Sequence, residues 1–285
     1  MNYVNCNLCP RLCGVDRTQG KTGYCKAPAT AVVSKTMLHK WEEPVLAPNG
    51  KSGAIFFGGC NLGCVYCQNY AISRMPQGCF FDGSALRTEM ESLIARGAEN
   101  IDLVSPSPYL PTILEALSAP LPVPVIYNTG GYERPEAIAA LQGKVDIYLP
   151  DLKYAGSILA GALSAAPNYF PVATNAICEM VKQVGKPVFD GDKLLKGVII
   201  RHLILPGQIE NSLKVLDWIA DTFAPGQVLV SLMRQYTPTP GMQPPLDRPI
   251  TEEEYDAVLS WMYLNGIEGF TQEAASSDAN FIPDF

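Results

Sequence analysis

Six short runs of apolar and β-branched residues, separated by amphipathic segments, follow one another from Gly53 onward. This alternation is typical of β/α units, whose strands lie parallel in one sheet with helices packed against it. Six units predict an α/β fold with a partial (β/α)6 TIM-type barrel, in which a ligand binds at the carboxyl ends of the strands. The predicted strands are Ala54–Gly58, Ile101–Ser105, Val123–Asn128, Val145–Leu149, Gly197–Leu205 and Val228–Met233.

Start and stop signals of helices lie between and after these runs. Gly97 is expected to end a helix, Asn211 to cap the start of another, and Thr251 with Glu254 to form a capping box. The apolar stripes of these helices are interpreted as core and not as cofactor-binding elements.

Composition restricts the class of protein. The chain has 285 residues, a net charge of −7 and a pI near 4.9, which does not favour an extended phosphate-binding face. The sequence starts without a basic stretch followed by an apolar one, and no apolar run approaches the roughly 20 residues that a bilayer requires. We therefore expect a cytoplasmic protein that binds neither nucleic acid nor membrane.

Nine cysteines in a chain without a signal peptide are interpreted as reduced metal ligands and not as a disulfide framework. Seven of them fall into two groups. Cys79 and Cys178 stand alone, and we expect them to be packing residues.

Three cysteines follow directly on the first predicted strand with the spacing C-x3-C-x2-C. Thiolates at this spacing can hold three irons of a 4Fe-4S cubane, which leaves the fourth iron open to a ligand that is not protein. A zinc site or a set of buried thiols is the alternative, but zinc sites usually take C-x2-C pairs with a fourth ligand of their own. The spacing favours a 4Fe-4S cluster held by Cys60, Cys64 and Cys67.

The second group of cysteines lies in residues 1–50, which we predict to be a small Cys-rich metal-binding segment ahead of a catalytic domain at 51–285. So short a segment cannot fold on apolar burial alone, and metal binding would supply most of its folding energy. A structural zinc ion and an auxiliary iron-sulfur cluster both remain open. The ligands would be Cys6, Cys9, Cys13 and Cys25.

The chain has two histidines. His39 opens the run His39–Pro44, which is expected to cross the barrel mouth, and an unpaired histidine there is more often a packing residue than a catalyst. His202 alternates with Arg201 along its strand and is expected to be structural.

Charged residues stand at the ends of two predicted strands. Asp151 and Lys153 are two residues apart on an extended segment, so they point the same way and could engage the two charged ends of a zwitterionic amino acid. A surface ion pair is the alternative. Arg201 lies within an apolar strand, where it is costly unless it meets a carboxylate of the protein or of a ligand.

The cysteine triplet resembles the signature of the radical S-adenosylmethionine (SAM) superfamily, in which an aromatic residue, here Tyr66, precedes the last cysteine. The run from Cys64 to Asn69 is similar to the cluster loop of pyruvate formate-lyase activating enzymes and of the related PflX-type proteins. The PflX-type proteins also carry a similar Cys-rich N-terminus.

The resemblance implies where SAM would bind. Asn69 matches an asparagine that contacts SAM, and Asp-Leu-Lys with Arg-x4-Pro-Gly match the activating enzymes. The usual Gly-Gly-Glu type segment, which binds the methionine amino group, has no counterpart with an acid here, so serines or nearby carbonyls would accept from that group. An asparagine also replaces the aspartate of the activating enzymes' Asp-Thr-Asn-Gly element, which puts a monovalent-cation site in doubt. The implied cofactor-binding residues are Tyr66, Asn69, Ser105, Ser107, Asn128, Asp151, Lys153 and Arg201.

The resemblance also implies an activity. A radical SAM oxidoreductase cleaves SAM reductively at the 4Fe-4S cluster, and the 5′-deoxyadenosyl radical abstracts a hydrogen atom. Here the first hypothesis is an activase that installs a glycyl radical on a partner enzyme and takes electrons from a flavodoxin or ferredoxin. Radical modification of a small molecule or a peptide side chain, and a non-catalytic iron-sulfur protein, are the alternatives.

Overall fold

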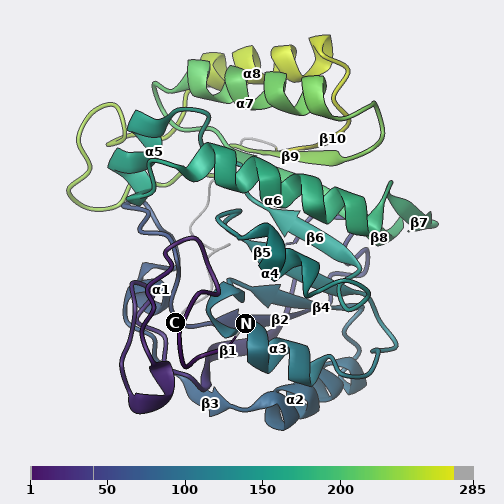
Figure 1. Cartoon of the computed structure of the whole chain (residues 1–285). Coiled ribbons are helices and arrows are strands. Elements are labelled where there is room, and N and C mark those ends of the chain that lie inside the picture. The colour runs from purple at the N-terminus through teal and green to yellow at the C-terminus, as the bar shows by residue number, and fades with distance from the viewer. Residues whose placement is uncertain (1, 41, 273–285) are drawn as a thin grey trace.

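The computed structural model describes residues 2–40 and 42–272 of the chain. Within these ranges ten strands form one curved sheet, with helices arranged along its outer side (Figure 1). The strands are β1 (Ala31–His39), β2 (Ser52–Phe57), β3 (Cys79–Phe81), β4 (Asn100–Val104), β5 (Val125–Thr129), β6 (Ile147–Pro150), β7 (Val188–Asp190), β8 (Lys193–Leu203), β9 (Leu229–Met233) and β10 (Gly269–Thr271).

The strand order is β10-β9-β8-β6-β5-β4-β2-β1-β3, with β7 paired to β8. Neighbouring strands from β10 to β2 are parallel, whereas β1, β3 and β7 pair in the antiparallel direction. The predicted fold class, a partial parallel α/β barrel, is confirmed.

The six predicted strands are present as β2, β4, β5, β6, β8 and β9, with shifted ends. The prediction missed the other four. Strands β3, β7 and β10 have three residues each, which is too short for an alternation to stand out. Strand β1 lies inside the predicted N-terminal segment and pairs along β2, so the later part of that segment is built into the sheet.

Period-two alternation divides the inner face of the barrel into two levels. Buried isoleucines and leucines of β5, β6, β8 and β9 pack together at the lower level, among them Ile126, Leu149 and Ile199. Two residues further along β5, β6 and β8, the same face presents Asn128, Asp151 and Arg201. The barrel is therefore closed by apolar packing below and has a polar opening at the carboxyl ends of its strands.

The helices lie along the outer side of the sheet, from α8 and α7 beside β9 and β10 to α2 and α3 at the opposite end (Figure 1). None of the helices in the described part of the chain is both long and apolar enough to cross a bilayer. The helices are α1 (Tyr70–Arg74), α2 (Gly83–Ala95), α3 (Leu110–Ala116), α4 (Pro135–Ala139), α5 (Ser157–Ser164), α6 (Tyr169–Val184), α7 (Ile209–Thr222) and α8 (Glu252–Leu264), with short 3-10 turns at Arg17–Gln19 and Ser107–Tyr109.

Two of the local predictions can be checked at helix starts. The capping box of Thr251 and Glu254 is confirmed at the start of α8. The prediction for Asn211 is wrong, because Gln208 stands at the start of α7 and Asn211 lies inside the helix. Its amide bonds to other backbone groups, accepting from Ala155 N (2.9 Å) and donating to Lys153 O (2.9 Å).

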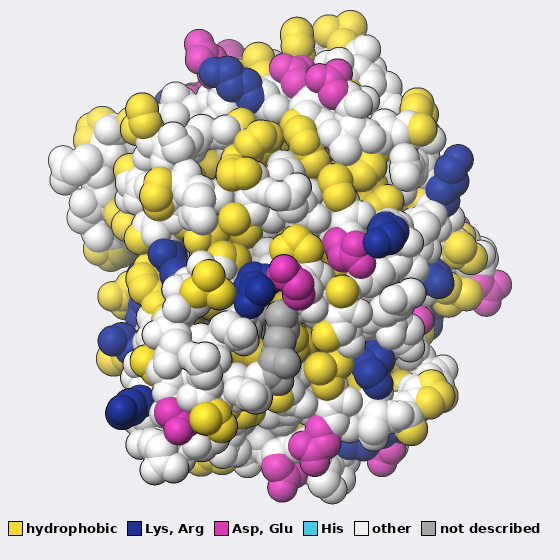
Figure 2. Space-filling view, viewed as in Figure 1, with side chains coloured by type: hydrophobic (Ala, Val, Ile, Leu, Met, Phe, Trp, Pro, Cys, Tyr) yellow, Lys and Arg dark blue, Asp and Glu magenta, His cyan; other side chains and the backbone are white. Residues whose placement is uncertain are grey.

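The two isolated cysteines lie at the surface. Cys79 and Cys178 are both exposed, so the prediction that they are packing residues is wrong. On the face seen in Figure 2, Lys and Arg side chains are scattered among acidic and apolar ones and do not gather in one patch.

Candidate functional site

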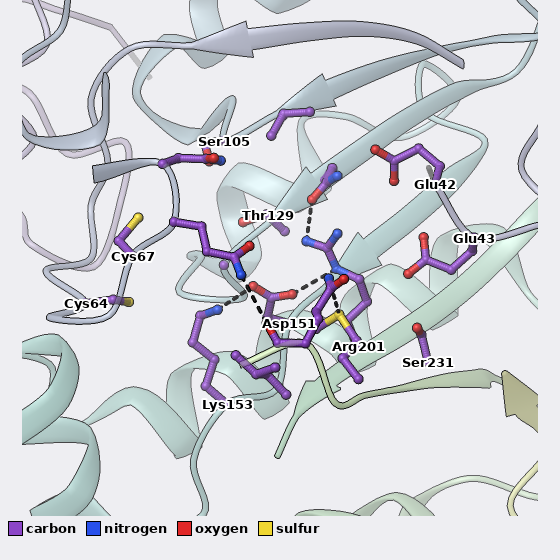
Figure 3. A pocket seen from close by; sticks show the side chains of 18 of the residues that line it. Glu42, Glu43, Cys64, Cys67, Ser105, Thr129, Asp151, Lys153, Arg201 and Ser231 are labelled. Atoms are coloured by element: carbon purple, nitrogen blue, oxygen red, sulfur yellow. Dashed lines mark hydrogen bonds and ion pairs between the residues drawn. The ribbon is translucent and has the colours of Figure 1, made fainter. Parts of the chain in front are cut away.

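A cavity of about 340 Å³ opens at the carboxyl ends of the strands. The loop after β2 supplies one side of it, and the ends of β4, β5, β6, β8 and β9 supply the floor and the walls. Figure 3 shows Cys64 and Cys67 at one side, Asp151, Lys153 and Arg201 in the middle and two glutamates at the other side. Of the residues predicted to bind a cofactor, the cavity is lined by Tyr66, Asn69, Ser105, Asn128, Asp151, Lys153 and Arg201.

The cysteine triplet lines this cavity as well. Burial raises the pKa of the Cys60 thiol, and the nearby charges of Cys64 and Cys67 raise it further, so the three sulfurs lie within electrostatic reach of one another. Burial also raises the pKa of Cys64, against which the positive charge of Lys153 acts. Each sulfur lies near a polar N–H or O–H group, as Leu62 N to Cys60 Sγ (3.4 Å), Ser164 Oγ to Cys64 Sγ (2.9 Å) and Ser73 Oγ to Cys67 Sγ (3.5 Å).

This donor set fits an iron-sulfur cluster. Hydrogen bonds to ligating sulfurs stabilise thiolates and tune the potential of a cluster, and here each of the three sulfurs has such a neighbour. The loop offers three thiolates, and the cavity beside them provides room for a further ligand.

A chain of hydroxyl groups leads from the barrel wall to Cys64. The phenol oxygens of Tyr66 and Tyr154 are 2.6 Å apart, and Tyr154 Oη is 2.7 Å from Ser164 Oγ, which donates to Cys64 Sγ. The Tyr66 ring also packs edge-on against Tyr236. Tyr66 is thus buried at the cavity wall. Tyr154 and Ser164 were not predicted as site residues, because neither lies in the cysteine motif.

Asp151 is the centre of a charged network on the cavity floor. Its Oδ1 accepts from Arg201 Nε (2.9 Å) and its Oδ2 from Lys153 Nζ (2.5 Å), and Arg201 Nη2 donates to Asn128 Oδ1 (2.6 Å). Burial opposes ionisation of Asp151, but the charges of Arg201 and then Lys153 outweigh it and lower its pKa. The side chains of Asp151 and Lys153 are only 12% and 16% exposed, so this is not a surface ion pair.

The backbone that carries Asp151 and Lys153 is held from two directions. Tyr169 Oη donates to the carbonyl of Asp151 (2.7 Å) and accepts from Lys153 N (3.1 Å), while Asn211 holds the carbonyl of Lys153. Gly131, at φ +79°, lies so close that an added Cβ would overlap the Asp151 carbonyl oxygen. This glycine is therefore explained by packing against the Asp-Leu-Lys segment.

The two serines after β4 lie in different surroundings. Ser105 lines the cavity and has a positive φ of 59°. Ser107 is buried outside the cavity lining, and its hydroxyl donates to Glu133. Glu133 also accepts from Thr129 Oγ1 (2.5 Å), and its burial raises its pKa to about 7. The sequence did not predict this acid as a site residue. It follows the Gly-Gly turn after β5, whereas Ser107, to which it is bonded, follows β4.

The run after β1 brings two acids to the cavity. Glu42, Glu43 and Pro44 line it, as expected for a segment that crosses the barrel mouth, and Trp41 lies outside the described residues. His39 lines the cavity too, and burial lowers its pKa. The other histidine, His202, is fully buried between Leu152 O (2.7 Å) and Ser212 Oγ (2.9 Å), in the structural role that its position predicted.

The N-terminal cysteines gather against the outside of the cluster loop. Burial raises the pKa of Cys9 to about 12, with further contributions from Cys25, Glu133 and Cys13. Arg11 joins this segment to the barrel, because it donates to Asn61 O (2.8 Å) and Ala165 O (2.7 Å) and lies over the ring of Tyr24.

The second metal site stays a prediction. Within residues 2–40 and 42–272, no three His, Cys, Asp or Glu side chains are placed as ligands of a single metal ion.

Solved structures share this fold. The chain has a TM-score of 0.54 and 14% identity with a radical SAM methyltransferase from Sphaerobacter thermophilus, covering 78% of this chain and 66% of that one. With HydG, a maturase of the FeFe-hydrogenase, the TM-score is 0.51 and the identity 13%, covering 78% of this chain and 50% of HydG. The chain thus spans about two thirds and one half of these enzymes. At such identities the likeness defines the fold, which is the partial barrel of these radical SAM enzymes.

A relative at higher identity identifies the family. The chain is 31% identical over 273 residues to the uncharacterized protein MJ0674 of Methanocaldococcus jannaschii, covering 90% of this chain and 74% of the relative. The chain belongs to the family of MJ0674. No protein-family model matches it.

Proposed function

We propose that this protein is a radical SAM enzyme, with a 4Fe-4S cluster at Cys60, Cys64 and Cys67. The observation that carries the proposal is that these thiols and the Asp151, Lys153 network open into the same cavity. When bound, the cluster and SAM supply reductive cleavage of a sulfonium, which yields methionine and a 5′-deoxyadenosyl radical able to abstract a hydrogen atom.

The residues of the floor bind and orient the amino-acid part of SAM. Lys153 and Arg201 are cations that attract its carboxylate, and Asp151 with the carbonyls beside Ser105 accepts from its ammonium group. Lys153 is suited to this role because it lies close enough to Cys64 for their charges to interact. Asn69 stands at the start of α1 without capping it through its side chain, so its amide can serve a ligand in the cavity that it lines.

The barrel also keeps water away from the reacting centre. Tyr66, Leu62 and Tyr154 are buried around the cysteine loop. Exclusion of water protects a reactive radical and strengthens the charged contacts on the floor.

The finer role that we propose is activation of a partner enzyme by installing a glycyl radical, with electrons from a flavodoxin or ferredoxin. The cluster loop, Asp-Leu-Lys and Arg-x4-Pro-Gly support it. Radical modification of a small molecule or a peptide side chain is the second candidate, supported by a cavity whose far wall carries two acids.

The N-terminal cysteines form the second proposed site. Cys6, Cys9, Cys13 and Cys25 would bind zinc or an auxiliary cluster, in support of which Cys25 and Cys9 lie within electrostatic reach of the other two thiols. Metal analysis of anaerobically purified protein identifies the ion.

The first test is cleavage of SAM. Reconstituted, dithionite-reduced protein is incubated with SAM, and 5′-deoxyadenosine is measured by mass spectrometry. Cys64→Ala should abolish the product and leave the N-terminal metal in place, whereas Cys79→Ser, at an exposed thiol, should change neither. Absence of product from well-loaded wild type overturns the proposal. A partner-dependent glycyl EPR doublet then selects the activase, and isotope-labelled small substrates test the other role.

A further inference from the structure

The side of the cavity that faces away from the cysteines is acidic. The carboxyl groups of Glu42 and Glu43 point from the segment after β1 toward Arg201 (Figure 3). The Glu42 side chain is 10% exposed, and its Oε1 is 3.9 Å from His39 Nε2. Because burial lowers the pKa of His39, this ring adds no positive charge near neutral pH.

Arg201 cannot neutralise these acids alone. Its Nε donates to Asp151 and its Nη2 to Asn128, and its charge also acts on Glu42 and Glu43, so one guanidinium is shared among several acids. Beneath the floor lies Asp102, a third acid whose Oδ2 accepts from Asn128 Nδ2 (3.2 Å). The wall and floor thus set four carboxyl groups against two cations, which are Arg201 and Lys153.

One carboxyl oxygen of this wall lacks a partner among the described residues, the buried Oε2 of Glu43. Asp102 is fully buried beneath the floor, and its carboxyl group shares a hydrogen bond with that of Glu42. An unpaired buried carboxylate oxygen is costly, and native proteins seldom leave one without a donor. Burial raises the pKa of all three carboxyl groups, a cost that a bound cation would remove.

We infer that Glu42 and Glu43 bind a cationic nitrogen of the substrate, an ammonium or a guanidinium group. This inference rests on the proposed function and names the substrate class of the same site. The groups that would hold SAM lie between the cysteines and Arg201, so the acids on the far side remain for a second ligand. The substrate is then an amine, a guanidine compound or a peptide with a basic side chain.

Equilibrium dialysis of the reconstituted protein with SAM tests the inference. The radiolabelled probes are butylammonium, butylguanidinium, 1-butanol and pentanoate, which share a butyl chain and differ in the head group. At least one cation should bind about tenfold more tightly than the alcohol and the carboxylate, since a hydrogen bond to a charged group is worth roughly that factor. Equal binding of 1-butanol overturns the inference without any variant.

Variants locate the site. Glu43→Gln and Glu42→Gln should each weaken binding of the cation about tenfold. Glu210→Gln is the matched control, because Glu210 lies on the outer surface with a side chain 90% exposed. Unchanged binding by both wall variants contradicts the inference. Displacement of the probe by Na⁺ or K⁺ at the same concentrations also contradicts it, by showing an inorganic cation site.

The two proposals fail separately. If reduced protein cleaves SAM but binds cations no better than 1-butanol, only the inference about the wall is wrong. If no 5′-deoxyadenosine forms without any probe, the radical SAM proposal is wrong whatever the dialysis shows.

Discussion

The pKa of Glu133 connects the turn after β5 to the stability of the whole barrel. This carboxyl group is buried, accepts hydrogen bonds from Ser107 and Thr129, and has its pKa raised by burial from 4.5 to about 7. Between these values the folded protein keeps a proton that the unfolded chain has released, so the free energy of unfolding falls as the pH rises. Each pH unit is worth about 1.4 kcal/mol, which makes the total loss roughly 3 kcal/mol.

Glu133→Gln removes this dependence and keeps an oxygen that accepts from both hydroxyls. We expect the variant to equal wild type near pH 4.5 and to exceed it by roughly 3 kcal/mol above pH 7. Urea unfolding followed by far-UV circular dichroism, at several pH values under anaerobic conditions, gives the difference between the two proteins. That difference cancels the other titrating groups. A difference that stays constant with pH would refute the argument.

Three further predictions concern the cavity floor and the residues that support the cavity. Ser164→Ala removes the hydrogen bond to Cys64 Sγ and should lower the midpoint potential of the cluster by tens of millivolts in an EPR redox titration; an unchanged potential would show that this bond does not act on the cluster. Asp151→Asn should weaken binding of SAM about tenfold in equilibrium dialysis, because the network that fixes two cations loses its anion. Gly131→Ala should destabilise the fold more than Gly143→Ala in urea unfolding: both have positive φ, a strain of about 1 kcal/mol, but only Gly131 faces a carbonyl, which adds roughly 1–3 kcal/mol. Equal losses would exclude the overlap.

The sequence predicted the parallel strands because their apolar runs are long enough to show a period. It also predicted which positions of the cavity floor carry charge, since Asp151 and Arg201 stand at the ends of such runs. Strand β1 escaped because its neighbours are cysteines and loops, and its partner, β2, is antiparallel to it. Which two segments pair cannot be predicted from the sequence of either segment alone.

The missed residues of the site have a common cause. Ser164 acts on the cysteine loop and Glu133 on the turn after β4, through contacts that only the folded chain creates. Asn211 was misjudged for a related reason. Asparagine near a helix start is a good cap, but its bonds to the backbone after β6, in the preceding β/α unit, compete with capping. Glu42 and Glu43 lie in a segment that the sequence placed at the barrel mouth, but the sequence analysis assigned no role to their carboxyl groups.

Arg11 makes the N-terminal segment a brace for the loop that carries the cysteine triplet. Its guanidinium donates to the carbonyls of Asn61 and Ala165 and lies 3.8 Å from the centroid of the Tyr24 ring and 5.2 Å from that of the Tyr132 ring. A truncated chain that begins at residue 51 would lack Arg11. The carbonyls of Asn61 and Ala165 would lose their hydrogen-bond donor, and the Tyr132 ring would lose its contact with the guanidinium. The first fifty residues are therefore not a detachable module, because their contacts help to hold the loop of the cysteine triplet in place.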